Sequence, residues 1–158
     1  MVVLAVVAMV TSGCVRIDGG AVEMSWALHT RDGRAISDCG CTEPEVATVR
    51  LHLTLMKVGD TVPDPTHCEG GAQYSFACQR HTGATPFEVP ETKPDERYRV
   101  CVDTLGKDGA VLTNVVAPAP VLRSVVKGQP TDMGALLLVT DCASTCSGVN
   151  GQGVCARP

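Results

Sequence analysis

Residues 48–57 read TVRLHLTLMK and form the clearest alternation of apolar and polar side chains in the chain. A repeat of two is the period of a β-strand that buries one of its faces. Four apolar residues would point toward a core and three polar residues would point away from it: Val49, Leu51, Leu53 and Leu55, against Arg50, His52 and Thr54. The stretch therefore predicts a strand with one buried and one solvated face.

Segments of similar character lie on both sides of this strand, separated by turn signals rich in glycine, proline and aspartate. Residues 35–45, which contain Cys39-Gly40-Cys41, are expected to form a stapled loop or one short helical turn, and residues 128–133 a turn. The expected strands are residues 21–30, 48–57, 72–79, 96–104, 110–116, 121–127 and 134–140, with a short edge segment at 86–89. Seven or eight short strands at this spacing predict an all-β fold, a single antiparallel β-sandwich with Greek-key or meander connections.

The composition agrees with β structure and argues against some partners. Valine, threonine, glycine and proline are abundant, and long helical runs are absent. The chain has 158 residues, a formal net charge of −4, and only one Trp, two Tyr and two Phe. A mildly acidic chain is not expected to bind nucleic acid. Trp26, the single tryptophan, should lie in the core.

The first fourteen residues, MVVLAVVAMVTSGC, combine an apolar run with small residues and a cysteine. Residues 2–10 have the length of a signal-peptide core and are too few to span a bilayer as a helix. Residues 11–13 are small, and Cys14 follows at once. This segment resembles the lipobox of bacterial lipoprotein precursors. The resemblance implies that Cys14 accepts a diacylglyceryl group, that a peptidase cuts before it, and that the new amino terminus is acylated.

The segment departs from that family at two points, because Thr11 stands where leucine is usual and no basic residue precedes Arg16. The alternative interpretation is a buried first strand that ends at Cys14. With a lipobox, the chain divides into a signal peptide (1–13), a lipidated tether (14–20), a β-sandwich domain (21–141) and a Cys/Gly-rich tail (142–158) pinned by disulfides. The resemblance implies a lipid anchor in the cell envelope and an oxidising extracytoplasmic compartment, and Val15 favours the outer membrane.

Setting Cys14 aside leaves an even number of cysteines, which suits an exported disulfide protein. These eight disulfide candidates are Cys39, Cys41, Cys68, Cys78, Cys101, Cys142, Cys146 and Cys155. The one pair we predict is Cys68–Cys78, because the two flank a Gly-Gly turn and could clamp a hairpin. The alternative is that Cys39, Cys41 and the tail cysteines serve as thiolate metal ligands or redox groups, since the spacing of Cys142 and Cys146 is permitted in zinc sites. Disulfides are the favoured interpretation, with no metal and no cofactor.

The histidines suggest no stronger site. His29 and His52 lie on the polar faces of their strands, where they would be solvated unless the two strands paired and brought the imidazoles together. His67, with Asp60 and Asp64 nearby, lies in a loop that could hold a divalent ion but matches no calcium-loop pattern.

Acidic pairs and catalytic motifs add little. The pairs Glu43/Glu45 and Asp95/Glu96 are expected in exposed loops, where no burial would raise a pKa. The chain has no Gly-x-Ser-x-Gly, no His-Glu-x-x-His and no Gly-rich phosphate loop. No catalytic residue is therefore assigned, and the protein is expected not to be an enzyme.

Residues 98–102 (YRVCV) and 106–111 (GKDGAV), with Gly128-Gln129 before a late apolar strand, give a second resemblance. Together they are similar to transthyretin-like, immunoglobulin-like sandwich domains, a resemblance that implies a fold and no functional residues. The chain also resembles bacterial lipoproteins built as one such domain. We expect a lipid-anchored, non-enzymatic binding or structural module that meets an envelope partner through loops 58–71 and 79–95. A metal or redox protein is the alternative, and a hydrolase ranks last.

Overall fold

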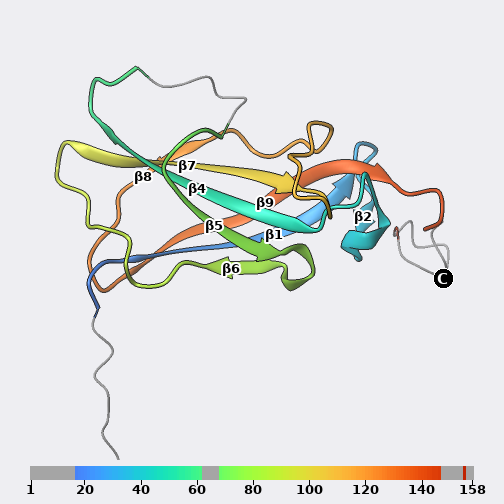
Figure 1. Cartoon of the computed structure of the whole chain (residues 1–158), viewed down its shortest axis with the longest axis horizontal. Coiled ribbons are helices and arrows are strands. Elements are labelled where there is room, and N and C mark those ends of the chain that lie inside the picture. Colours follow the sequence, from blue (N-terminus) through green and yellow to red (C-terminus); the bar gives the residue numbers. More distant parts are fainter. Residues whose placement is uncertain (1–16, 62–67, 147–154, 156–158) are drawn as a thin grey trace, which may run out of the picture.

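The computed structural model, which describes residues 17–61, 68–146 and 155, contains two facing sheets (Figure 1). One sheet has the order β2-β1-β9-β3, with β6 also paired to β1, and the other has the order β5-β4-β7-β8. The strands are β1 (Ala21–Thr30), β2 (Ala35–Ile36), β3 (Thr42–Glu43), β4 (Thr48–Lys57), β5 (Ala72–Ala77), β6 (Thr82–Ala84), β7 (Glu96–Leu105), β8 (Val121–Arg123) and β9 (Pro130–Cys142). The predicted all-β sandwich is confirmed.

The pairing of β4 with β7 is the centre of the second sheet. These two ten-residue strands run antiparallel and pair residue for residue over their full length. The alternation of β4 buries Val49, Leu51 and Leu53 against the first sheet, as predicted. Leu55, which was expected on the same buried face, is about half exposed, so the buried part of that face ends at Leu53.

In the first sheet β1 and β9 lie side by side and run parallel (Figure 1). The other strand pairs among the described residues are antiparallel, as predicted. Parallel neighbours need a long crossover connection, and here most of the sandwich forms it. The register between the two strands shifts between Glu23 and Ser25, opposite Gly134, whose φ of +72° suits glycine at an irregular point of a strand.

Trp26 lies in the core between the sheets, as predicted. Its indole Nε1 donates a hydrogen bond to the backbone oxygen of Cys78 at 2.9 Å, which satisfies the buried N–H. Its ring centroid lies 6.4 Å from that of Phe76. The other apolar residues on this face of β1 are buried with it: Val22, Met24 and Leu28.

Several strands of the second half differ from the prediction in extent. Residues 110–116 form no strand and contribute only isolated bridges at Val111 and Val116. The expected strand at 121–127 shortens to β8, and β9 begins inside the expected turn at 128–133. The edge segment at 86–89 gives one bridge at Val89, while β6 lies just before it. Alternation of apolar and polar residues shows which face of a segment is buried, but it does not show whether a neighbouring strand is present to pair with it. The segments at 86–89, 110–116 and 121–127 therefore pair over fewer residues than predicted.

All eight candidate cysteines are joined in four disulfides: Cys39–Cys78, Cys41–Cys146, Cys68–Cys101 and Cys142–Cys155. The predicted Cys68–Cys78 pair is wrong. The six-residue strand β5 separates the two cysteines and pairs along β4 from Leu53 to Thr48. They therefore lie at opposite ends of a strand roughly 20 Å long, beyond the reach of one disulfide.

The 3-10 turn η1 (Cys39–Cys41) supplies one cysteine to each of two disulfides, Cys39–Cys78 and Cys41–Cys146. It is the short helical turn expected in residues 35–45, and the Asp38 carboxylate accepts a hydrogen bond from the backbone N–H of Gly40 at 2.7 Å to cap it. The chain returns to β2 at Cys155, whose N–H donates to the carbonyl of Ala35 at 2.9 Å. Disulfides thus hold Cys142, Cys146 and Cys155 of the tail, and Cys155 bridges to Ile36 of the edge strand β2.

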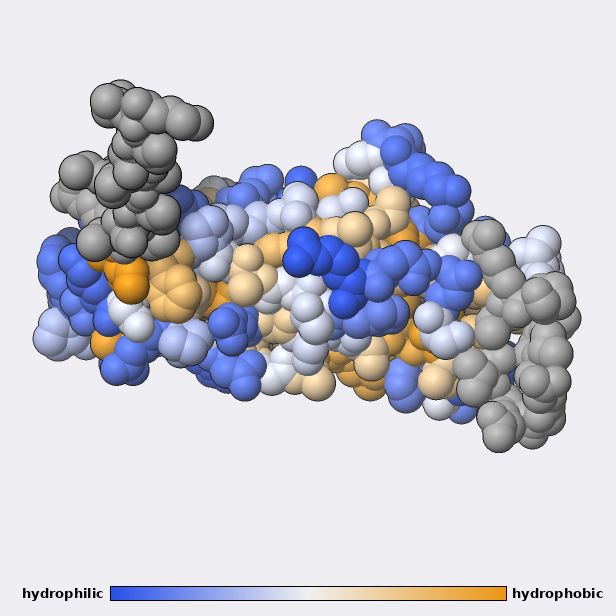
Figure 2. All heavy atoms as spheres, turned by 90° about the horizontal axis from the view of Figure 1, so that it is seen from below, coloured by the Kyte–Doolittle hydropathy of each residue, from blue (hydrophilic) through white to orange (hydrophobic). Residues whose placement is uncertain are grey.

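The surface shows no broad apolar face in the view of Figure 2, where charged and apolar residues are interspersed. Exposed large apolar residues are spread over three strands and several connecting segments: Ile17, Leu55, Val58, Phe87, Val111, Val116, Leu122, Val126 and Leu137. Within the part of the chain that the structure describes, no helix has the length and apolar character of a membrane span.

Candidate functional site

The polar residues of β4 meet three residues of β7 on the outer side of their sheet. The register places Arg50 opposite Asp103, His52 opposite Cys101, and Thr54 opposite Arg99. The outer face of a sheet is usually solvated, yet His52 and Arg99 are each only 2% exposed and Cys101 only 4%. The prediction that His52 is solvated is therefore wrong.

The burial follows from the connection between β4 and β5, which returns across this outer face. Cys68 is bonded to Cys101 in the middle of β7. The hydroxyl of Thr54 donates to the carbonyl of Glu69 at 3.3 Å. Gly71 then passes so close to β4 that an added Cβ would lie 2.2 Å from the carbonyl oxygen of Leu53, and its φ is +72°. The disulfide and this close passage hold the end of the connection against the sheet.

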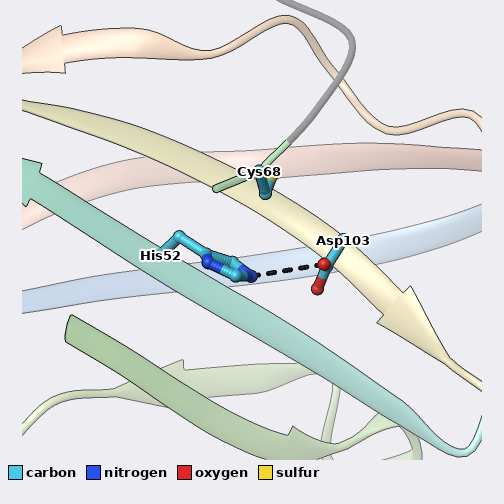
Figure 3. Close-up of side chains that lie close together, drawn as sticks. All are labelled: His52, Cys68 and Asp103. Carbon is cyan, nitrogen blue, oxygen red and sulfur yellow. Dashed lines mark hydrogen bonds and ion pairs between the residues drawn. The ribbon is translucent and has the colours of Figure 1, made fainter. Parts of the chain in front are cut away.

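Asp103 is the polar centre of the site. Its carboxylate accepts two hydrogen bonds from Arg50, from Nε at 2.9 Å and from Nη2 at 2.7 Å. It also accepts a hydrogen bond from Nε2 of His52 at 3.2 Å (Figure 3). Because Arg50 donates to both carboxylate oxygens, it fixes the orientation of the carboxylate and also stabilises its negative charge.

Opposing effects act on the pKa of Asp103. Burial alone would raise it, but the hydrogen bonds from His52 and Arg50, with their charges, outweigh burial and hold the pKa below its usual range. The same hydrogen bond to Asp103 raises the pKa of Arg50. The pair is therefore ionised at neutral pH.

His52, Cys68 and Asp103 are close enough to share a ligand. One donor atom from each lies within 4.8 Å of the other two, and Figure 3 shows His52 and Asp103 facing each other below Cys68. The Nδ1 atom of His52 has no hydrogen-bond partner among the described residues. The donor types, imidazole nitrogen, sulfur and carboxylate oxygen, are those that zinc accepts. In the disulfide form, however, the sulfur of Cys68 is bonded to carbon and sulfur and is not a thiolate.

The structure separates the other histidine candidates. His29 lies on β1 and His52 on β4, which belong to different sheets, so the two strands do not pair and do not bring the imidazoles together. His67 and Asp64 lie outside the described residues. Asp60 is exposed and accepts a hydrogen bond from the backbone N–H of Lys57 at 2.7 Å, which makes it a turn-stabilising residue.

The metal alternative named Cys39, Cys41 and the tail cysteines as ligands. The structure joins these residues in three disulfides, with Cys78 as the only additional partner. Their sulfurs are therefore not available as thiolate ligands in this form.

The expectation of two solvated carboxylate pairs is wrong for Glu96, which is only 6% exposed at the start of β7. The backbone N–H of Lys93 donates to Glu96 at 3.0 Å, and the Lys93 ammonium lies 3.3 Å from the same carboxylate. These contacts hold the pKa of Glu96 below its usual range, against the effect of burial. Glu45 forms an ion pair with Lys107 at 2.8 Å. Neither carboxylate is arranged for acid–base chemistry.

One signal in the sequence could have located the covered face. Alternation in β7 points Tyr98, Val100 and Val102 inward, and therefore points Cys101 outward. An outward cysteine that forms a disulfide needs a partner from a segment lying over the outer face. The two nearest cysteines in sequence before it, Cys68 and Cys78, were then the candidates to test.

A small apolar hollow lies between β7, β8 and β9. It encloses about 70 Å³ and is lined mostly by apolar residues: Val100, Val102, Pro118, Ala119, Val121, Arg123, Met133 and Leu136. Typical small-molecule sites are several times larger, so this hollow is not a ligand pocket of ordinary size. Comparison of the chain with family models, with curated proteins and with solved structures gave no match. The site is therefore interpreted from its own geometry.

Proposed function

We propose that this protein is a lipid-anchored component of the bacterial cell envelope whose β-sandwich serves as a non-enzymatic binding or structural module. In this proposal Cys14 carries the lipid, residues 1–13 are removed, and residues 15–20 connect the anchor to β1. Six extended residues reach only about 20 Å, so the sandwich would sit close to the membrane. The outer membrane is the favoured location because Val15 follows the lipidated cysteine.

The observation that carries the proposal is the pairing of the cysteines. Eight of the nine cysteines bond to one another in four disulfides, and the count leaves Cys14. Four disulfides are consistent with an oxidising, extracytoplasmic compartment. The remaining cysteine is the one that follows the apolar run and three small residues, where a lipobox would have its lipid acceptor.

A binding or structural role is supported by the way the β4–β5 connection is held. Loops of a sandwich tolerate variation while the sheets keep them in place. Here the connection is also bonded through Cys68 to the middle of β7. Residues 68–71, at the end of the connection that is held in this way, would meet a partner with little ordering cost on binding.

The test is to replace Cys14 with Ala and to fractionate the cells. We expect the wild-type protein in the membrane fraction with the mass of a cleaved, acylated chain, and the Cys14→Ala protein outside that fraction and without the lipid mass. Ser12→Ala is the matched control, because it keeps a small residue and leaves the acceptor in place. The proposal is wrong if Cys14→Ala protein still partitions with membrane at the same mature mass.

A further inference from the structure

The Cys68–Cys101 disulfide lies against a buried histidine and a carboxylate that is mostly buried. His52, Cys68 and Asp103 each have a donor atom within 4.8 Å of the other two. Cys101 supplies the second sulfur, bonded to Cys68 and opposite His52 in the sheet. No other group of three His, Cys, Asp or Glu residues in the described part of the chain meets this distance.

We propose that reduction of the Cys68–Cys101 disulfide converts this cluster into a binding site for a thiophilic divalent metal ion, with Zn²⁺ as the expected occupant. A dithiol reductant would break the S–S bond and become a cyclic disulfide, passing two electrons and two protons to the two sulfurs. Metal binding would then displace both thiol protons, giving two thiolate ligands. The ligands would be Cys68, Cys101, His52 and Asp103.

The donor set fits a tetrahedral zinc ion in type and in scale. Zinc is held by thiolate, imidazole and carboxylate groups with bonds of about 2.0–2.3 Å, which places neighbouring donors about 3.3–3.8 Å apart. His52 Nε2 and Asp103 Oδ2 are already 3.2 Å apart, and no separation among the three donors exceeds 4.8 Å, so the cluster has to close by at most about 1.5 Å. Cys68 lies in a connecting segment rather than in a strand, so breaking its bond to β7 removes the covalent link that fixes its sulfur.

Charge and burial support the same assignment. Two thiolates and the Asp103 carboxylate carry three negative charges, and a divalent ion with the Arg50 guanidinium carries three positive charges. Arg50 already holds Asp103 with two hydrogen bonds, as an outer partner of a ligand should. His52 is only 2% exposed, and its Nε2, which donates to Asp103, is the ring nitrogen that faces the cluster. The ion would replace the proton on Nε2, and the ring would then carry its proton on Nδ1, which makes no hydrogen bond within the described residues. A neutral imidazole is an ordinary metal ligand.

One substitution opens the site without any reductant. In a Cys14→Ser background, Cys101→Ser frees the Cys68 thiol and leaves the other three disulfides intact. We expect this variant to bind one Zn²⁺ per chain, and to show thiolate-to-metal charge-transfer absorption when Co²⁺ is used as the probe. Cys155→Ser is the matched control, because it frees one thiol, that of Cys142, away from His52 and Asp103. Near-UV circular dichroism would verify that both variants are folded.

A second substitution tests the ligand set. Loss of an outer-shell partner costs roughly 10–100-fold in metal affinity, so replacing a direct ligand should cost more than about 100-fold. His52→Gln, added to Cys101→Ser, should therefore weaken Zn²⁺ binding by at least that factor. The proposal is overturned if folded Cys101→Ser binds no metal, binds it no more tightly than Cys155→Ser, or is unaffected by His52→Gln.

If Cys101→Ser does not fold, the proposal is tested instead by alkylating the cysteines of gently reduced Cys14→Ser protein. Zn²⁺ should then protect Cys68 and Cys101 from alkylation, as mapped by mass spectrometry, relative to metal-free protein. Unchanged alkylation of these two residues would overturn the proposal. The site does not depend on the lipid anchor, so its failure leaves the proposed function untouched.

Discussion

At Asp103, the energetic cost of burial is offset by two specific partners. The side chain is 14% exposed, and that of Arg50 is 20% exposed, so water screens their interaction less than at an open surface. Both guanidinium contacts are short, and His52 adds a third donor to the same carboxylate. Removing the carboxylate would leave a cation without its partner in a largely buried position.

Asp103→Asn is expected to lower the free energy of unfolding by about 2–4 kcal/mol, since breaking one side of a mostly buried, hydrogen-bonded ion pair leaves the other side uncompensated. The measurement is the urea midpoint at constant m-value. Glu45→Gln is the matched control, because its ion pair with Lys107 is more exposed and should change stability by less than about 1 kcal/mol. Equal effects of the two substitutions would contradict the role given to Asp103.

The lowered pKa of Asp103 makes part of this stability dependent on pH. A carboxyl whose pKa is lower in the folded than in the unfolded protein stabilises the fold above its unfolded pKa, about 4. That contribution is lost as pH falls through the folded pKa. The stability difference between wild type and Asp103→Asn should therefore be largest at neutral pH and shrink below about pH 4. A difference that is constant from pH 7 to pH 3 would contradict this linkage.

At the scale of elements, two adjacent glycines determine how the β4–β5 connection enters β5. Gly70 and Gly71 both have positive φ, +69° and +72°. An added Cβ at Gly70 would meet nothing within 4 Å, whereas at Gly71 it would lie 2.2 Å from the backbone oxygen of Leu53. The first position needs only the left-handed conformation, and the second also needs the absence of a side chain.

Gly70→Ala is expected to cost about 1–2 kcal/mol, the usual cost of a left-handed conformation for a residue with a Cβ. Gly71→Ala should cost more than about 3 kcal/mol, because the backbone of the connection must also move away from β4. Chemical denaturation of the two variants gives the comparison, and each serves as the other's control. If both cost the same, the close passage over Leu53 is not a feature of the folded protein.

The strands whose bounds were predicted best are the three ten-residue strands with regular alternation of apolar and polar residues. β1 and β4 match the expected ranges, and β7 differs by one residue, because long period-two alternation requires only one buried face. The parallel pairing of β1 with β9 could not be predicted, since it depends on which distant strand fills that edge. The prediction of a strand at 110–116 was wrong for the same reason, because alternation shows which face of a segment is buried but not which strand would pair with it.

The candidate site shows the same division. The alternation of β4 placed Arg50 and His52 on the outer face correctly, but the burial of His52 depends on the segment that the Cys68–Cys101 disulfide holds over that face. Eight cysteines pair in too many ways for the sequence to choose among them. Once that disulfide is known, the covered face follows from the register of β4 and β7.

For the whole molecule, the disulfides close loops of very different length. Cys41 and Cys146 are separated by 105 residues, and their bond ties η1 to the segment after β9. Cys142 and Cys155 are separated by 13 residues, and their bond ties the end of β9 to Cys155, which bridges to Ile36 of β2. If a disulfide stabilises mainly by restricting the unfolded chain, the long closure should contribute more.

Replacing both cysteines of one disulfide with serine tests this order. The chain-entropy relation gives about 5 kcal/mol for the Cys41–Cys146 closure and about 3 kcal/mol for the Cys142–Cys155 closure. The midpoint of guanidinium unfolding, under non-reducing conditions and at constant m-value, should therefore fall further for the first double variant. Mass mapping must find the three other disulfides intact in each protein. A larger loss for the second variant would mean that the tail's hydrogen bonds to β2, which Cys155 holds in place, stabilise the sandwich more than chain entropy does.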